Sequence, residues 1–187
     1  MKDRHLGLFG GTFDPPHLGH VAALQAASAS GRFDRIVVTV AGDPYMKSPR
    51  VDPPNERLAM AHAAFDDIPL VEVSDLEILR SGPSYTIDTV RELLVSAEAI
   101  DLIVGADLAR QLNAWRDAQA LRELVEVAIV PRPGASIPAL EGWRWYEIAM
   151  QPVDLSSTFI RDMSLSDADL KKYLPAGVIP LFLRARG

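Results

Sequence analysis

Short apolar runs in this chain alternate with longer stretches in which apolar residues recur every three or four positions. The short runs indicate buried strands of a parallel sheet, because a strand covered on both faces has no polar positions. The longer stretches have the period of a helix with one buried face. The predicted strands span residues 6–9, 36–40, 70–73, 100–104 and 127–130, with a final short strand at 147–150.

Helices are predicted in the segments between and after these strands. Their ranges are 18–29, 55–65, 85–97, 118–124, 157–163 and 167–173, and a further helix is expected after Asp107. Asn55 and Ser166 are the expected N-caps of the second and last of the numbered helices. Alternating strands and helices predict an α/β protein with an open parallel sheet and helices on both faces. We expect a single domain over residues 1–187.

Composition and charge narrow the function classes. The 187 residues are 48% hydrophobic and carry a net charge of −6, without any cysteine. The acidic balance argues weakly against nucleic-acid and anionic-membrane partners, although local cations and backbone N–H groups can still hold a phosphorylated substrate. The lack of cysteine removes disulfides, thiolate metal sites and cysteine nucleophiles. No apolar run approaches the roughly 20 residues of a membrane span, and no secretory signal is evident, so the cytoplasm is the expected location.

The strongest chemical signal is the stretch Gly-Gly-Thr-Phe-Asp-Pro-Pro-His-Leu-Gly-His at residues 10–20. It follows a predicted strand and opens a helix, where doubly wound sheets bind ligands. Gly10 and Gly11 would let the backbone approach a nucleotide, and Gly19 would clear space at a helix N-terminus that attracts phosphate. His17 and His20 are three apart and would face one ligand if that turn is helical. Two surface histidines or a metal pair are the alternatives, and no third ligand lies nearby.

A second segment combines hydroxyl groups with an arginine. Ser156, Ser157 and Thr158 precede a predicted short helix, and Arg161 follows one turn later. Hydroxyls at a helix start add donors to the free backbone N–H groups, and a guanidinium can bind phosphate through two parallel bonds. Ordinary N-capping beside a solvated arginine explains the same pattern about as well.

The remaining candidate positions have weaker signals. Gly105 and Asp107 end a predicted buried strand, where an acid can accept hydrogen bonds from ribose hydroxyls. Trp115 offers a flat ring for stacking, although core packing is an equally ordinary role. Residues 84–89 alone resemble a capped helix start, and Lys47 in a proline-rich loop alone resembles a solvated lysine.

Four segments together, in their order along the chain, resemble bacterial nicotinate-nucleotide adenylyltransferases of the nucleotidylyltransferase superfamily. They are residues 10–20, 84–89, 105–107 with Trp115, and 156–161, and the resemblance covers nearly the whole chain. The resemblance implies a Rossmann-like nucleotidyltransferase fold and a catalytic set of His17, His20 and Arg161. The ATP-binding set that it implies is Gly10, Gly11, Thr12, Phe13, His17, His20, Gly105, Asp107, Ser156, Ser157, Thr158 and Arg161. The mononucleotide-binding set is Lys47, Tyr85, Thr86 and Trp115.

The resemblance also implies a reaction, in which AMP passes from ATP to nicotinate mononucleotide and Mg²⁺ arrives with ATP rather than in a protein metal site. Nicotinamide mononucleotide or phosphopantetheine could be the acceptor instead, and a non-catalytic nucleotide-binding paralogue is a further alternative. Intact His17, His20 and Arg161 weigh against the last. A homo-oligomer is compatible with the sequence. Two segments depart from the family pattern, the loop 41–50 and the tail 181–186.

Overall fold

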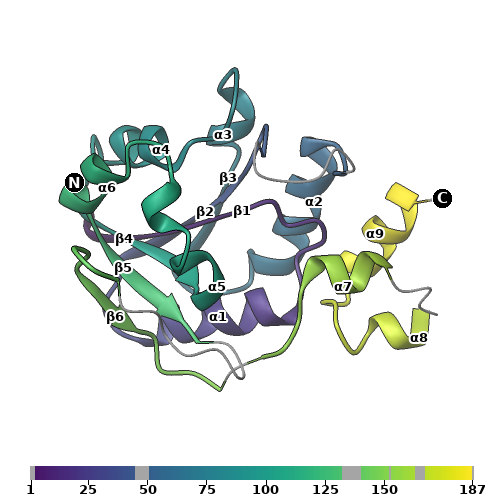
Figure 1. Cartoon of the computed structure of the whole chain (residues 1–187). Coiled ribbons are helices and arrows are strands. Elements are labelled where there is room, and N and C mark those ends of the chain that lie inside the picture. Colours follow the sequence, from purple (N-terminus) through teal and green to yellow (C-terminus); the bar gives the residue numbers. More distant parts are fainter. Residues whose placement is uncertain (1–2, 45–50, 132–139, 152, 163–166, 187) are drawn as a thin grey trace.

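The computed structural model describes residues 3–44, 51–131, 140–151, 153–162 and 167–186, and this part of the chain contains one sheet of six parallel strands (Figure 1). The strand order is β3-β2-β1-β4-β5-β6. The direction in which strands are added therefore reverses between β1 and β4, as in the doubly wound dinucleotide-binding fold. The predicted open parallel sheet is confirmed.

The strands β1, β2, β4 and β5 extend the predicted apolar cores, and β3 is displaced by one residue from its predicted range. Their bounds are β1 Asp3–Gly11, β2 Arg35–Val40, β3 Val71–Ser74, β4 Ala97–Gly105, β5 Val125–Val130 and β6 Trp145–Glu147. A final strand is present as predicted, but its predicted bounds of 147–150 were wrong. The edge strand β6 pairs with β5 from Trp145 onward and leaves two of its three side chains exposed, so it has no apolar run to reveal it. Ile148, which lies in the predicted range, is buried just after the strand.

The helices described by the structure include two that match their predicted ranges residue for residue, α1 and α6. The bounds are α1 Leu18–Ala29, α2 Pro54–Phe65, α3 Leu76–Leu79, α4 Thr86–Leu93, α5 Ala106–Ala109, a 3-10 turn at Leu112–Ala114, α6 Ala118–Leu124, α7 Ser157–Asp162, α8 Asp167–Leu170 and α9 Val178–Arg186. The short helix α3 and the C-terminal helix α9 were not predicted.

Two helix ends correct the sequence analysis. Asn55 is not an N-cap, because α2 starts one residue earlier, with Pro53 at the N-cap position and Pro54 in the first turn, where a proline's missing N–H costs nothing. The helix predicted over 85–97 ends at Leu93, since the chain from Ala97 pairs with Asp3 and joins β4. The predicted N-cap Ser166 lies outside the described residues.

Helices cover both faces of the sheet (Figure 1). On one face, Leu24 of α1 and Phe65 of α2 pack with apolar residues of β1, β2, β4 and β5. On the other face, Val90 of α4 and Leu121 of α6 pack against the same strands. A third cluster joins α7, α8 and α9 to α2. The segments that follow β6 therefore lie beside the carboxyl ends of the strands. No helix in the described ranges is both long and apolar enough to cross a membrane.

Candidate functional site

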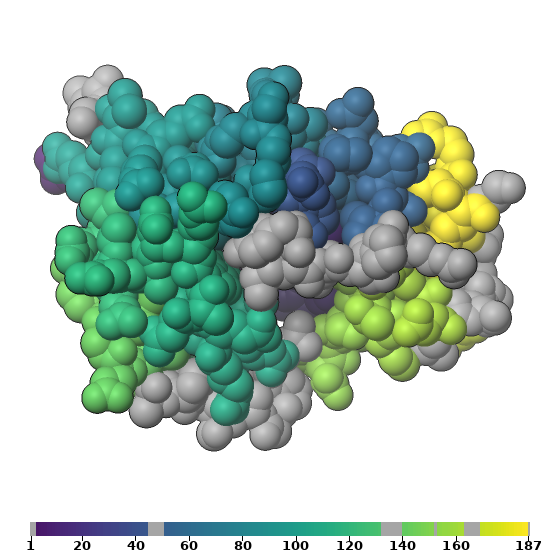
Figure 2. Space-filling model, turned by 45° about the horizontal axis from the view of Figure 1, so that its top comes forward, coloured from purple at the N-terminus to yellow at the C-terminus, as the bar shows by residue number. Residues whose placement is uncertain are grey.

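A cavity of about 460 Å³ opens at the carboxyl ends of β1 and β4. Figure 2 shows the molecule hollowed between the green elements around α5 and the yellow-green helix α7. The wall of this cavity contains all twelve residues of the predicted ATP-binding set, from Gly10 to Arg161. Thr86 and Trp115 also line it. Tyr85 is not among the lining residues, and Lys47 lies outside the described residues. Segments that are far apart in sequence thus meet at one site.

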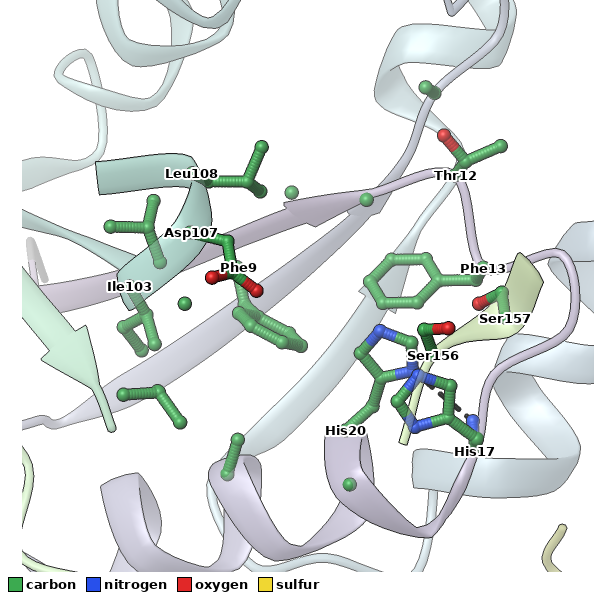
Figure 3. Close-up of a pocket in the computed structure, with 18 of the residues that line it drawn as sticks. Phe9, Thr12, Phe13, His17, His20, Ile103, Asp107, Leu108, Ser156 and Ser157 are labelled. Atoms are coloured by element: carbon green, nitrogen blue, oxygen red, sulfur yellow. Dashed lines mark hydrogen bonds between the residues drawn. The ribbon is translucent and has the colours of Figure 1, made fainter. Parts of the chain in front are cut away.

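The two histidines of the first motif lie against each other. Their rings are stacked with centroids 3.7 Å apart, and His17 is only 2% exposed (Figure 3). The backbone N–H of His17 donates a hydrogen bond to Nδ1 of His20 at 3.1 Å. Because Nδ1 accepts this bond, a neutral His20 carries its proton on Nε2. In this tautomer Nε2 of His20 is a hydrogen-bond donor, and His20 lines the cavity.

The glycines of this motif make room for aromatic side chains. A Cβ on Gly11 would lie 2.6 Å from Cζ of Phe13, and a Cβ on Gly19 would lie 3.0 Å from Nδ1 of His17. Phe13 itself has a φ of 51°, a conformation that bulky residues seldom adopt. Its ring meets His20 edge to face at 5.2 Å (Figure 3). The rings of Phe13 and His17 therefore occupy the space next to Gly11 and Gly19, and all four residues line the cavity.

The helix α7 is attached to the first motif by its hydroxyl groups. Ser156 Oγ accepts the backbone N–H of Phe159 at 3.1 Å and so caps α7, as predicted for ordinary N-capping. Ser157 Oγ donates to the carbonyl oxygen of Pro15 at 2.9 Å. The N-terminus of α7 is therefore held against the loop between β1 and α1, and both serines line the cavity.

Arg161 is anchored to the same loop. Its guanidinium donates to the carbonyl oxygen of Asp14, and also to Oγ1 of Thr158 at 3.2 Å. Its Nη1 lies 3.7 Å from Oδ2 of Asp14, whose side chain is almost fully buried. Arg161 is thus a cation in the cavity wall, and its side chain is 22% exposed. The alternative of a solvated surface arginine does not describe this geometry.

Sequence analysis missed Arg57, which organises the loops beside the cavity. Its side chain is 1% exposed and donates to the carbonyl oxygens of Asp52 at 2.8 Å, Thr12 at 2.9 Å and Gly42 at 3.4 Å. Burial lowers the pKa of its guanidinium from the usual value, and nearby carboxylates oppose that shift. An arginine within an amphipathic helix predicts a solvated face, so its pattern carried no signal for this role.

The other end of the cavity is lined by Thr86, Trp115 and a second missed residue, Glu77. The carboxylate of Glu77 is buried and accepts a hydrogen bond from Oγ1 of Thr89 at 2.8 Å. Tyr85 sits next to this wall, with the guanidinium of Arg116 4.8 Å from its ring centroid. The structure therefore brings Thr86 and Trp115 to one surface and leaves Tyr85 beside it.

Comparison with known proteins identifies the family. A model of the cytidylyltransferase-like family matches residues 8–163. A protein of Roseiflexus sp. (strain RS-1) is 36% identical over 100% of this chain and 98% of its own length, and is named "Probable nicotinate-nucleotide adenylyltransferase". A protein of the same name from Thermus thermophilus is 34% identical over 92% of this chain and 87% of its own length.

Solved structures agree on the fold. The nicotinic acid mononucleotide adenylyltransferase of Plasmodium falciparum complexed with APC superposes with a TM-score of 0.81 at 19% identity, over 98% of this chain and 96% of that one. The same protein complexed with NaAD also gives 0.81, at 21% identity, over 97% and 95% of the two chains. The cavity at the β1–β4 reversal is consistent with this fold. The family model and the near-full-length relatives show that this chain belongs to the nicotinate-nucleotide adenylyltransferase family.

Proposed function

We propose that this protein transfers AMP from ATP to nicotinate mononucleotide, which yields nicotinate adenine dinucleotide and pyrophosphate. One observation carries the proposal: the stacked His17 and His20, the hydroxyls of α7 and Arg161 converge on one cavity at the β1–β4 reversal. The names of the relatives and the dinucleotide complex of the Plasmodium falciparum enzyme support the same acceptor.

ATP would occupy the part of the cavity between α1, α5 and α7. His17, and His20 through its Nε2–H, would contact the phosphates, with Ser156, Ser157, Thr158 and the guanidinium of Arg161 on the triphosphate side. Gly10, Gly11, Thr12 and Phe13 would form the wall beneath it, and Gly105 and Asp107 would hold the adenosine. The histidines, hydroxyls and arginine would donate hydrogen bonds to phosphate oxygens, and the glycines would let the nucleotide approach the backbone closely. Asp107 would accept hydrogen bonds from the ribose hydroxyls.

Nicotinate mononucleotide would occupy the end lined by Thr86 and Trp115. Trp115 offers a ring face to the pyridine ring, and the N-terminus of α4 at Thr86 offers backbone N–H donors to its carboxylate. Tyr85 and Lys47 complete the set that we propose for this substrate. Tyr85 would act from beside the cavity wall, and Lys47 would bind phosphate.

The chemistry that this site supports is a direct in-line displacement. A 5′-phosphate oxygen of the mononucleotide attacks the α-phosphorus of ATP and forms the new P–O bond, while the bond to the bridging α–β oxygen breaks and pyrophosphate leaves with its electrons. The nucleophile is already an anion, so the site needs no general base and no covalent residue. Orientation of the two reactants can account for roughly 7–11 kcal/mol of the barrier, and donors such as His20 stabilise the developing charge.

The donor set of the cavity fits phosphate oxygens better than a resident metal. Imidazole, hydroxyl and guanidinium groups line it together with the carboxylates of Asp14, Glu77 and Asp107. The described residues contain no group of three His, Asp or Glu side chains placed to share an ion. Mg²⁺ keeps several waters and binds readily to substrate phosphates. We therefore expect it to arrive with ATP, where it would neutralise charge on the triphosphate.

The acceptor is tested by measuring pyrophosphate release from ATP and Mg²⁺ with nicotinate mononucleotide, nicotinamide mononucleotide and phosphopantetheine. Donors at the start of α4 favour the carboxylate over the neutral amide, because hydrogen bonds to charged groups contribute about 1.5–3 kcal/mol. The expected preference in kcat/KM is roughly ten- to hundredfold for the nicotinate form.

Equal efficiency with both pyridine nucleotides, or preference for the amide, would overturn the acceptor and leave the adenylyl transfer standing. Release with none of the three acceptors would overturn the transferase activity itself. The His20→Ala variant provides the background rate, because it keeps the fold and removes a donor from the phosphate site.

A further inference from the structure

The C-terminal helix α9 reaches the segment that carries Arg161. In its last turn, Nη1 of Arg186 donates a hydrogen bond to the backbone carbonyl oxygen of Arg161 at 2.9 Å. The same guanidinium lies 4.3 Å from the ring centroid of Phe182, one turn earlier on its own helix. The Arg186 side chain therefore packs on Phe182 of its own helix and donates a hydrogen bond to α7.

The short length of α7 makes this contact important. With six residues, α7 has carbonyl groups in its last turn that lack partners inside the helix. A cationic donor at a helix C-terminus satisfies such groups and interacts favourably with the helix dipole. Ser156 and Ser157 hold the N-terminal end of α7, and Arg186 holds the other end. The Arg161 side chain projects from a helix that is fixed at both ends.

A series of hydrogen bonds links Arg186 to charged residues of the cavity wall. The backbone N–H of Asp52 points to Oδ2 of Asp14 at 3.4 Å, and Asp14 in turn binds Arg161. Burial, followed by the neighbouring Asp14, raises the pKa of Asp52 from its usual value to about 6, and the positive charge of Arg186 opposes that rise. Residues from four separate segments thus form one charged cluster that runs from Asp52 to Asp14, Arg161 and Arg186.

We propose that Arg186 is a positioning residue for ATP binding, which holds α7 so that Arg161 presents its guanidinium to the triphosphate. The inference rests on the proposed function, which supplies ATP as the ligand. It is distinct from simple attachment of α9, because Met60, Ile160 and Phe182 belong to a buried apolar cluster that joins α2, α7 and α9 without Arg186. Loss of the Arg186 guanidinium should therefore alter the last turn of α7 while α9 stays docked.

The first test compares Arg186→Gln with wild type by calorimetric binding of a non-hydrolysable ATP analogue and by steady-state kinetics. One hydrogen bond contributes about 0.5–1.5 kcal/mol, so ATP binding should weaken roughly three- to tenfold. The KM for nicotinate mononucleotide should not change. Arg186→Lys should recover part of the loss, and Arg184→Gln, an exposed arginine on the same helix, should match wild type.

The decisive measurement is a double-mutant cycle with Arg161→Gln, read as dissociation constants of the ATP analogue below the melting temperature of every variant. If Arg186 acts through Arg161, Arg186→Gln weakens binding no further once Arg161 is replaced. The same loss in both backgrounds, an equal change in the KM of both substrates, or no change in ATP binding would each overturn the inference. A wild-type protein that binds the ATP analogue without adenylyl transfer would instead count against the proposed function.

Discussion

Two buried aspartates, each 1% exposed, have opposite surroundings in this molecule. Asp101 lies in the middle of β4, away from the cavity wall, and its carboxylate is saturated. It binds Nε2 of His5 at 2.7 Å, accepts the hydroxyl of Tyr146 at 2.6 Å and lies 3.7 Å from the guanidinium of Arg32. This cluster joins β1, β4 and β6 across the sheet. His5, which had no functional signal in the sequence, is part of it.

Asp14 lies in the cavity wall, and its carboxylate is poorly satisfied. Among the described residues Oδ1 has no hydrogen-bond partner, and Oδ2 has a long bond from Asp52 N–H at 3.4 Å and Arg161 at 3.7 Å. A buried acceptor without partners costs about 1–3 kcal/mol. The comparison shows that this fold satisfies its buried charge fully where the acid supports the sheet. It tolerates an incompletely satisfied acid where the backbone and Arg161 form the cavity wall.

The largest expected effect is a loss of turnover, which a substitution in the cavity wall should cause and one elsewhere should not. His20→Ala should lower kcat by about 10²–10³, because it removes an electrostatic stabiliser from the phosphate site. Its melting temperature should fall by only a few degrees, since one hydrogen bond and two ring contacts of the cavity wall are lost. Rapid-quench turnover and thermal unfolding measure the two quantities. His62→Ala, which removes an exposed histidine paired with Asp66, is the matched control and should keep full turnover. Near-wild-type turnover in His20→Ala would contradict the assignment.

The second prediction compares the two aspartates by stability. Asp101→Asn should cost about 1–3 kcal/mol, because one charged acceptor of the His5, Tyr146 and Arg32 groups is lost. At about 2–4 °C per kcal/mol for a chain of this size, the fall in melting temperature is readily measured, with both KM values unchanged. Asp14→Asn should cost less, since its carboxylate makes only long contacts with the Asp52 N–H and Arg161. Equal destabilisation by the two substitutions would break the comparison.

The smallest effect concerns pH. The pKa of Asp52 is raised to about 6, first by burial and then by Asp14, so the folded state favours its protonated form. Its stabilising contribution is therefore complete below about pH 4 and is lost as pH rises through 6. The Asp52→Asn variant cannot ionise at this position. Its melting temperature should equal that of wild type at pH 4 and should be roughly 1–3 °C higher at pH 7. The gain is small because solvent screens this partly exposed group.

Thermal unfolding between pH 4 and 7 checks this difference. Asp67→Asn, at an exposed acid in the turn after α2, should show no such pH-dependent gain. A constant offset between Asp52→Asn and wild type at every pH would show that the carboxyl group does not titrate differently in the folded state.

Local physics determined the order of elements and the position of the first motif. The buried strand before Gly10 and the helix α1 follow from apolar periodicity and a glycine-rich turn, signals that act within a few residues. The family resemblance followed from the same stretch together with three further segments. Periodicity failed where a segment had no apolar run of its own, as in β6, and at the end of α4, where pairing of Ala97 with Asp3 decided the boundary.

Only the tertiary structure decided which polar groups share an environment. Arg57 and Arg186 have ordinary sequence surroundings, and Asp14 belongs to the first motif without a role of its own there. Their contacts arise because chain segments far apart meet at the carboxyl ends of the strands. Burial and charge pairing depend on distances through space. A pattern of residue types along the chain specifies such distances within one element and not between elements.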